Sequence, residues 1–377
     1  MDQVEPAPGP LDRIYRPTDL LLHPSGRYLY VLSSNFDGRY RERDGGSVLV
    51  LDTEAMTLVP DAGVRIASYG AAMTLADTAE NPRLFVSARG NGGLFALDVA
   101  GEGGSLRCEG STSGAACRLP GPGRDPTGIA WLGRRAGPQG SVDLVAATAL
   151  GGTVALLGVP ERLADTRSVR AAGPQGALYL RPDSAGDGFY VGGRFDNFVI
   201  EMGWSVDEAG YPRALGPRGR VQLPSSVVDR RNPFPESRDM VFSPLYPQAY
   251  VALINPRGLF VIALDEDADG RSTRRVTGRI PLESQPGRFV VAATEEVELL
   301  YVALPQENSV AVVEPVSSRV LERFVVGERP WALALDAERE RLYVAHFLDN
   351  SIGKIELGAD HPERGMMQHV WPPGGAP

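Results

Sequence analysis

The sequence predicts an all-β protein, a single β-propeller of seven four-stranded antiparallel blades around a central channel. One short apolar pattern recurs seven times, at spacings between 42 residues (Tyr301 to Tyr343) and 60 residues (Tyr190 to Tyr250). These spacings match the length of a four-stranded propeller blade. The chain also holds 44 Gly and 31 Pro and no long stretch of helical periodicity, which is typical of short strands joined by turns.

The seven copies of the pattern are expected to form the second strand of each blade. They lie at Tyr30–Leu32, Phe85–Ser87, Leu144–Ala146, Tyr190–Gly192, Tyr250–Ala252, Tyr301–Ala303 and Tyr343–Ala345. An apolar run precedes each copy, and a third and a weaker fourth run follow it; in the sixth unit these are residues 289–291, 310–314 and 319–325. The inner runs are almost continuously apolar because neighbouring blades cover both of their faces, whereas the fourth run is amphipathic because it forms the outer edge.

The repeats fill residues 11–371, which we expect to form one domain between short tails at 1–10 and 372–377. The ring has to close at the last blade. Two segments could supply the outer strand there, Leu11–Tyr15 and Met366–Val370, and the sequence leaves both open.

The most regular unit consists of Gly327–Asp336, Arg341–His346 and Asp349–Ile352, and it resembles the YVTN family of β-propeller repeats, with His346 in place of the usual Asn. The first unit, at His23–Val31, is similar to the lactonase-type seven-bladed propellers. The resemblance extends over nearly the whole chain and implies the propeller fold. Its motif specifies a blade and no chemistry.

Charge and hydropathy limit the partners. The formal net charge of −9 disfavours nucleic acid and anionic membranes, both of which reward a basic surface. No apolar run approaches the length of a membrane helix. The acidic, proline-rich first residues lack the regions of a signal peptide, so we expect either a cytosolic protein or the mature form of an exported one.

The two cysteines favour export. Cys108 and Cys117 bracket a small polar segment, and a disulfide between them indicates an oxidising compartment, the periplasm or the cell surface. The other interpretation is a pair of free thiols in a cytosolic loop. Their spacing fits no zinc or haem motif.

Arginines gather at one predicted mouth of the channel. In a propeller, the connections between blades and those between second and third strands share one face. The residues near these connections are Arg16, Asp19, Arg124, Asp125, Arg194, Arg238, Asp239, Arg288, Arg329 and His346. They could bind an anionic ligand through arginine forks. Alternatively, each arginine pairs with a neighbouring acid and joins adjacent blades.

The opposite face carries a candidate calcium site. Asp265, Asp267 and Asp269 alternate with other residues and precede Gly270, an arrangement that could bring oxygen ligands around Ca²⁺. The twelfth position of this loop is Val276, so it is not an EF-hand. A solvated acidic turn is the other interpretation.

Catalytic motifs are missing from the sequence. There is no nucleophile elbow, P-loop, haem-attachment or dinucleotide-binding motif, and His346 is the one candidate acid–base residue. The sequence therefore favours a non-enzymatic binding or scaffolding propeller that takes a protein or a small anionic ligand at the channel mouth. The alternative is a lactonase-like hydrolase with its site at the same mouth.

Overall fold

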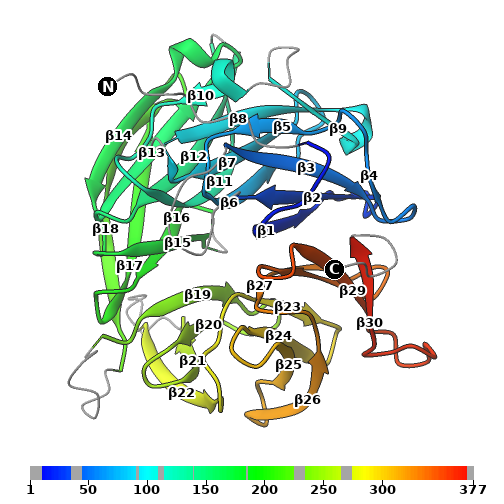
Figure 1. Ribbon diagram of the computed structural model, residues 1–377. Coiled ribbons are helices and arrows are strands. Elements are labelled where there is room, and N and C mark those ends of the chain that lie inside the picture. Colours follow the sequence, from blue (N-terminus) through cyan, green and yellow to red (C-terminus); the bar gives the residue numbers. More distant parts are fainter. Residues whose placement is uncertain are drawn as a thin grey trace, which may run out of the picture.

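The computed structural model describes residues 11–34, 45–90, 93–108, 114–138, 140–183, 186–224, 234–264 and 274–371. They form seven antiparallel sheets arranged in a ring, which confirms the predicted seven-bladed propeller (Figure 1). The seven apolar repeats all lie on the second strand of a blade, as expected.

The strands of each blade follow one another along the chain. Blades 1 and 2 contain β1 (Pro17–Leu22), β2 (Tyr28–Ser33), β3 (Gly46–Asp52), β4 (Thr57–Leu58), β5 (Val64–Ile66), β6 (Gly70–Ala76), β7 (Arg83–Ala88), β8 (Gly93–Ala100), β9 (Ser105–Arg107) and β10 (Arg118–Leu119). Blades 3 and 4 contain β11 (Pro126–Gly137), β12 (Gly140–Ala149), β13 (Thr153–Val159), β14 (Arg167–Ala172), β15 (Ala177–Pro182), β16 (Gly188–Gly193), β17 (Phe198–Val206) and β18 (Pro212–Gln222).

Blades 5 to 7 complete the ring. They contain β19 (Ser237–Phe242), β20 (Gln248–Leu253), β21 (Gly258–Ala263), β22 (Arg275–Pro281), β23 (Phe289–Ala293), β24 (Glu298–Leu304), β25 (Ser309–Glu314), β26 (Arg319–Val325), β27 (Pro330–Asp336), β28 (Arg341–His346), β29 (Ser351–Glu356) and β30 (Met367–Trp371). Short 3₁₀ turns lie at Gly101–Gly103, Gly114–Cys117 and Leu163–Asp165. None of the helical segments in the described part of the chain could cross a membrane.

The C-terminal segment closes the ring. β30 pairs with β29 and is the outer strand of blade 7, so the second of the two candidate segments supplies that strand. Residues 11–15 form no strand. Leu11 and Ile14 instead pack between blades 7 and 1, and the Arg16 amide donates a hydrogen bond to Asn350 Oδ1 at 3.0 Å.

The core is divided among the blade interfaces. Seven clusters of buried apolar side chains lie in the described residues, one between each pair of neighbouring blades. Tyr30, Tyr190, Tyr250 and Tyr343 are fully buried second-strand residues in these clusters. The apolar repeat is thus explained by burial of the second strand between two other blades.

The Cys108–Cys117 disulfide is present, with a Cα–Cα distance of 5.5 Å and both residues buried. It lies in the connection between β8, the third strand of blade 2, and the outer segment β10. β9 pairs with the end of β8 and β10 with its beginning, so the disulfide joins two halves of one interrupted outer strand.

One backbone device recurs at the start of the blades. In six first strands the ladder skips one residue, as between Pro17 and Asp19 and between Ser237 and Asp239. The residue before each of these strands has a positive φ, and they are Arg16, Tyr69, Asp125, Gly176, Glu236 and Arg329. A positive φ is sterically unfavourable for residues other than glycine. Because this conformation recurs at the start of six blades, it is a general feature of the fold and does not mark a functional site.

Candidate binding cavity at the channel mouth

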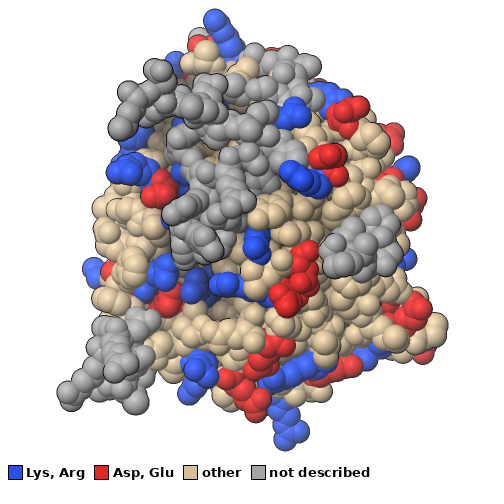
Figure 2. Space-filling model, viewed as in Figure 1, with Lys and Arg blue, Asp and Glu red and all other residues tan. Residues whose placement is uncertain are grey.

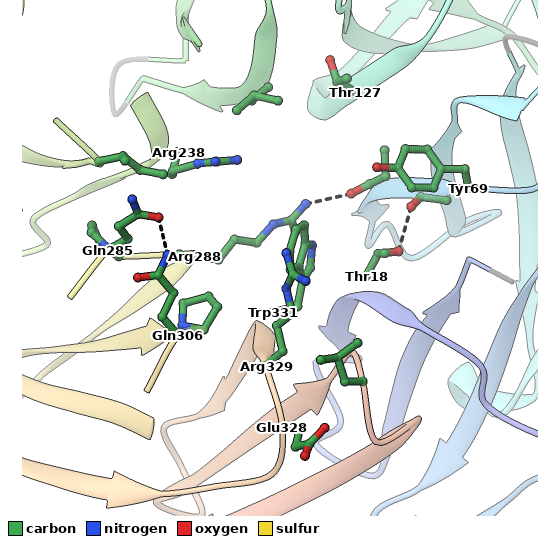
Figure 3. A pocket seen from close by; sticks show the side chains of 18 of the residues that line it. Thr18, Tyr69, Thr127, Arg238, Gln285, Arg288, Gln306, Glu328, Arg329 and Trp331 are labelled. Atoms are coloured by element: carbon green, nitrogen blue, oxygen red, sulfur yellow. Dashed lines mark hydrogen bonds between the residues drawn. The ribbon is translucent and has the colours of Figure 1, made fainter. Parts of the chain in front are cut away.

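The skipped residues line a cavity at the channel mouth. Its volume is about 650 Å³. In six blades, one residue of the first strand is left out of the pairing with the second strand, and this residue lies in the cavity wall. Blade 6 contributes the residue at the equivalent position. In order of the blades they are Thr18, Ala71, Thr127, Leu178, Arg238, Arg288 and Trp331. Of these seven positions, the three that carry a basic or aromatic residue are in blades 5 to 7 (Figure 3).

Arg288 crosses from blade 6 to blades 1 and 2. Its guanidinium bonds the Asp19 carboxylate and donates to the Ala71 carbonyl at 2.7 Å. Asp19 also accepts the amides of Met73 at 2.7 Å and Leu20 at 3.1 Å. Burial raises the pKa of the Asp19 carboxyl, and Arg288 opposes that shift. The Asp19 carboxylate thus accepts hydrogen bonds from blades 1, 2 and 6, and it links these three blades.

Asp239 has the equivalent place in blade 5. It accepts hydrogen bonds from Arg181 of blade 4, from its own neighbour Met240 at 2.9 Å and from the Phe289 amide of blade 6 at 3.4 Å. Asp19 and Asp239 therefore join blades, but neither pairs with the arginine nearest in sequence, Arg16 or Arg238. The alternative interpretation, in which arginine–acid pairs join blades, therefore fits Asp19 and Asp239, but their partners come from other blades.

Arg238 shares its acid with another arginine. Arg194 and Arg238 both contact Glu236 Oε1 at 2.8 Å. Burial lowers the pKa of Arg238, and the positive charges of Arg194 and Arg329 lower it further, against the opposing effect of Glu236. One carboxylate thus faces two guanidinium groups, and the local charge is positive. Figure 2 shows basic side chains in a row across the middle of the face drawn.

Arg329 lies among aromatic rings. Its guanidinium carbon is 5.5 Å from the centre of the Trp331 ring and 5.8 Å from that of Phe347, and these two rings are 5.2 Å apart. Within the described residues no carboxylate forms an ion pair with it. Arg16 donates to the Phe347 carbonyl at 3.1 Å, and its guanidinium carbon lies 5.2 Å from the centre of the same ring. Arg329 is therefore an exposed cation on an aromatic platform.

Side-chain amides form the wall on blade 6. Gln306 Nε2 donates to Gln285 Oε1 at 2.9 Å, and Asn308 Oδ1 accepts the Arg329 amide at 2.9 Å (Figure 3). In the described part of the chain, the remaining Gln285 Nε2 and Gln306 Oε1 atoms have no protein partner. The glutamine pair presents one donor and one acceptor, whichever way the two amides are turned.

Arg89 and Tyr69 also line the cavity, although the sequence analysis did not predict them as site residues. The Arg89 guanidinium lies 4.3 Å from the Tyr69 ring centre and 3.5 Å from Asp125. Tyr69 directly precedes β6 and Arg89 directly follows β7, both on the mouth face. The alignment of the repeats identifies the equivalent positions in every blade. Arg124, one of the predicted site residues, is exposed and does not line the cavity.

His346 is buried in blade 7 and does not line the cavity. Its Nδ1 lies 2.8 Å from the Ser351 hydroxyl, and its Nε2 is buried with no partner in the described residues. Burial lowers the pKa of the imidazole to about 4. His346 is therefore a buried structural residue that connects the second and third strands of blade 7.

The candidate calcium ligands Asp265, Asp267 and Asp269 lie outside the described residues. Within those that are described, no group of three or more His, Cys, Asp or Glu side chains is arranged to hold a metal ion. The calcium site stays a prediction.

Comparison with known proteins supports the fold and no more. No model of a known protein family matches the chain, and no curated protein matches it. Solved structures do: hydrazine synthase of Kuenenia stuttgartiensis (14% identity, TM-score 0.62, covering 93% of this chain and 98% of that one) and the periplasmic gluconolactonase PpgL of Pseudomonas aeruginosa (15%, 0.60, 83% and 86%). The β-propeller domain of Cps50 (Swd1) from Myceliophteria thermophila also matches (11%, 0.61, 92% and 98%).

These likenesses define the class. The chain is a seven-bladed β-propeller, a fold that it shares with a periplasmic gluconolactonase and with the β-propeller domain of Cps50 (Swd1). At such identities a common fold carries no common function, so the function has to be argued from the cavity itself.

Proposed function

We propose that this protein is a binding propeller whose mouth cavity takes an anionic ligand. The observation that carries the proposal is the surplus of guanidinium groups around a concave site. Arg194 and Arg238 share one carboxylate, and Arg329 lies exposed on Trp331 without an ion-pair partner in the described chain. A cavity of about 650 Å³ is within the usual range for small-molecule sites.

Arginine suits this role. Its planar fork bonds carboxylate or phosphate groups with two parallel donors, and it stays charged when partly buried. Trp331 adds a flat apolar wall beside the charge. The cavity therefore fits a ligand that joins a negative group to an apolar or planar part.

Lactone hydrolysis is the alternative, and the carboxylates at the mouth disfavour it. A hydrolase needs a base placed to activate water. Glu236, Asp19 and Asp125 are each engaged by arginine. Among the described residues that line the cavity, the one carboxylate is that of Glu328, which is exposed. Binding thus needs fewer additional assumptions than catalysis.

An exported location is part of the proposal. The Cys108–Cys117 disulfide is typical of oxidising compartments. One structural neighbour is a periplasmic protein by name. Fractionation of the native host, with the protein in the periplasmic or surface fraction, is the expected result.

Calorimetric titration tests the binding proposal. Succinate, citrate, phosphate and uncharged analogues would be titrated into wild type, Arg329→Gln and the control Arg319→Gln, which lies on the outer strand β26. We expect at least one anion to bind and its affinity to fall about tenfold to a hundredfold in Arg329→Gln, because a hydrogen bond to a charged group contributes about 1.5–3 kcal/mol. Equal affinity in all three proteins, or no binding at millimolar anion, would overturn the proposal.

A further inference from the structure

Exposed aromatic side chains continue the mouth cavity outward over blade 4. Phe195 and Phe234 are 47% and 39% exposed, and their rings meet edge to face at 6.2 Å. Arg194, next to Phe195, contacts Glu236, which in turn contacts the cavity residue Arg238. The two phenylalanines thus adjoin the cavity but lie outside its wall.

A small anion held inside the cavity would not use these rings. Exposed aromatic side chains beside arginines are the composition of contact surfaces for protein partners. Leu348 is 39% exposed and lies in the turn between the second and third strands of blade 7. It adds an apolar side chain to the cavity wall, away from blade 4. The contact surface is therefore larger than the anion site.

The glutamine pair identifies the chemistry of the occupant. Gln285 Nε2 remains as a donor and Gln306 Oε1 as an acceptor, side by side, on the wall of the cavity (Figure 3). A peptide group presents one carbonyl acceptor and one N–H donor, which matches this pair. Sulfate or a simple carboxylate has no donor for the Gln306 oxygen.

From these three features we infer that the occupant of the cavity is an acidic peptide segment of a protein partner. A carboxylate of the segment binds Arg238 and Arg329, one peptide group bonds the Gln285–Gln306 pair, and an apolar side chain packs on Phe195 and Phe234. The inference rests on the proposed anion binding and narrows it to one class of ligand.

Selection from a phage-displayed library of random 12-residue peptides tests it, because such a library does not presuppose the sequence. We expect the selected peptides to be enriched in Asp or Glu together with an apolar residue. Their synthetic versions should bind Gln306→Ala and Phe195→Ser at least fivefold more weakly than wild type, and Arg329→Gln more weakly still. Val316→Ser, which changes an exposed apolar residue outside the cavity lining, is the matched control.

Small anions separate this inference from the proposed function. Succinate and citrate should bind wild type, Gln306→Ala and Phe195→Ser alike, because neither side chain contributes to the charge. Selected peptides without acids, or with equal affinity for Gln306→Ala and wild type, overturn the peptide inference while anion binding stands. If Arg329→Gln leaves the affinity for small anions unchanged, the proposed function fails as well.

Discussion

Acid should destabilise this propeller through His346. The pKa of this imidazole is lowered from 6.5 to about 4 by burial, so the unfolded chain binds a proton more readily than the folded protein. The stability from neutral His346 is therefore present above pH 6.5 and is lost as the pH falls toward 4. At pH 5 the loss relative to pH 8 is about 2 kcal/mol by proton linkage.

That loss corresponds to a modest change in melting temperature. With an unfolding entropy of about 2.1 cal/mol/K per residue, the 377-residue chain should melt about 2–3 °C lower at pH 5 for this reason alone. Other groups also titrate in this range, so the measurement has to be differential. His346→Asn, which restores the residue usual in the repeat, removes the imidazole and keeps a polar group next to Ser351.

Scanning calorimetry of wild type, His346→Asn and the control His361→Asn at pH 8 and pH 5 checks this. His361 is exposed, so its substitution should leave the pH dependence unchanged. We expect the melting temperature of His346→Asn to fall less on acidification than that of wild type. A fall of the same size in all three proteins would refute the reasoning, because the burial of His346 would then have no linkage to folding.

Three further predictions concern the disulfide, one joint between blades and the candidate calcium loop. Replacing Cys108 and Cys117 together by alanine should cost roughly 2.5 kcal/mol by the loop-entropy estimate, measured as the change in denaturant midpoint; an unchanged midpoint would contradict a stabilising role. Asp19→Asn should cost about 3–5 kcal/mol, because it leaves Arg288 without its charge partner, and a loss below about 1 kcal/mol would count against the joint. If Asp265–Asp269 bind calcium, millimolar Ca²⁺ should raise the melting temperature and Asp267→Asn should abolish the rise; no shift in wild type would leave an acidic turn.

The repeats predicted the strands because the burial of a second strand dictates its composition. Tyr343–Ala345 and its six counterparts could be aligned from apolar character alone, and the structure places all of them on second strands. The sequence left ring closure open because Leu11–Tyr15 and Met366–Val370 are both short apolar runs. The first of them packs against the ring without pairing, a choice that depends on contacts with blade 7 far along the chain.

The partners of the mouth arginines could not be predicted by proximity in sequence. Arg288 bonds Asp19, which is 269 residues away, because a ring brings its first and sixth blades together across the channel. Arg124 and Arg238 both lie near a blade start, but only Arg238 occupies the skipped position and lines the cavity. Which of three consecutive residues faces the channel depends on the bulge, and the bulge has no residue signature that one sequence reveals.

The positions that the bulge turns toward the channel differ in their chemistry from blade to blade. In every blade, one residue at an equivalent position lies at the channel. The fold fixes this position, and the residue type determines its interactions. In blades 1 and 3 the residue is threonine, and the hydroxyls of Thr18 and Thr127 donate at 2.7 Å to the Gly70 and Ala177 carbonyls of the next blade. These hydroxyls are used to join blades, as is the guanidinium of Arg288.

If the cavity binds a ligand as proposed, Arg238 and Trp331 are the residues at these positions that are free to contact it. They stand in blades 5 and 7, next to Arg329 and the glutamine pair, and no carbonyl of a neighbouring blade engages the Arg238 guanidinium within the described structure. A ligand should therefore lie off the axis, against blades 5 to 7. Exchanging Thr18 or Thr127 for valine would weaken a joint between blades and leave ligand affinity unchanged, whereas Trp331→Ala should lower affinity because it removes the flat wall beside the charge.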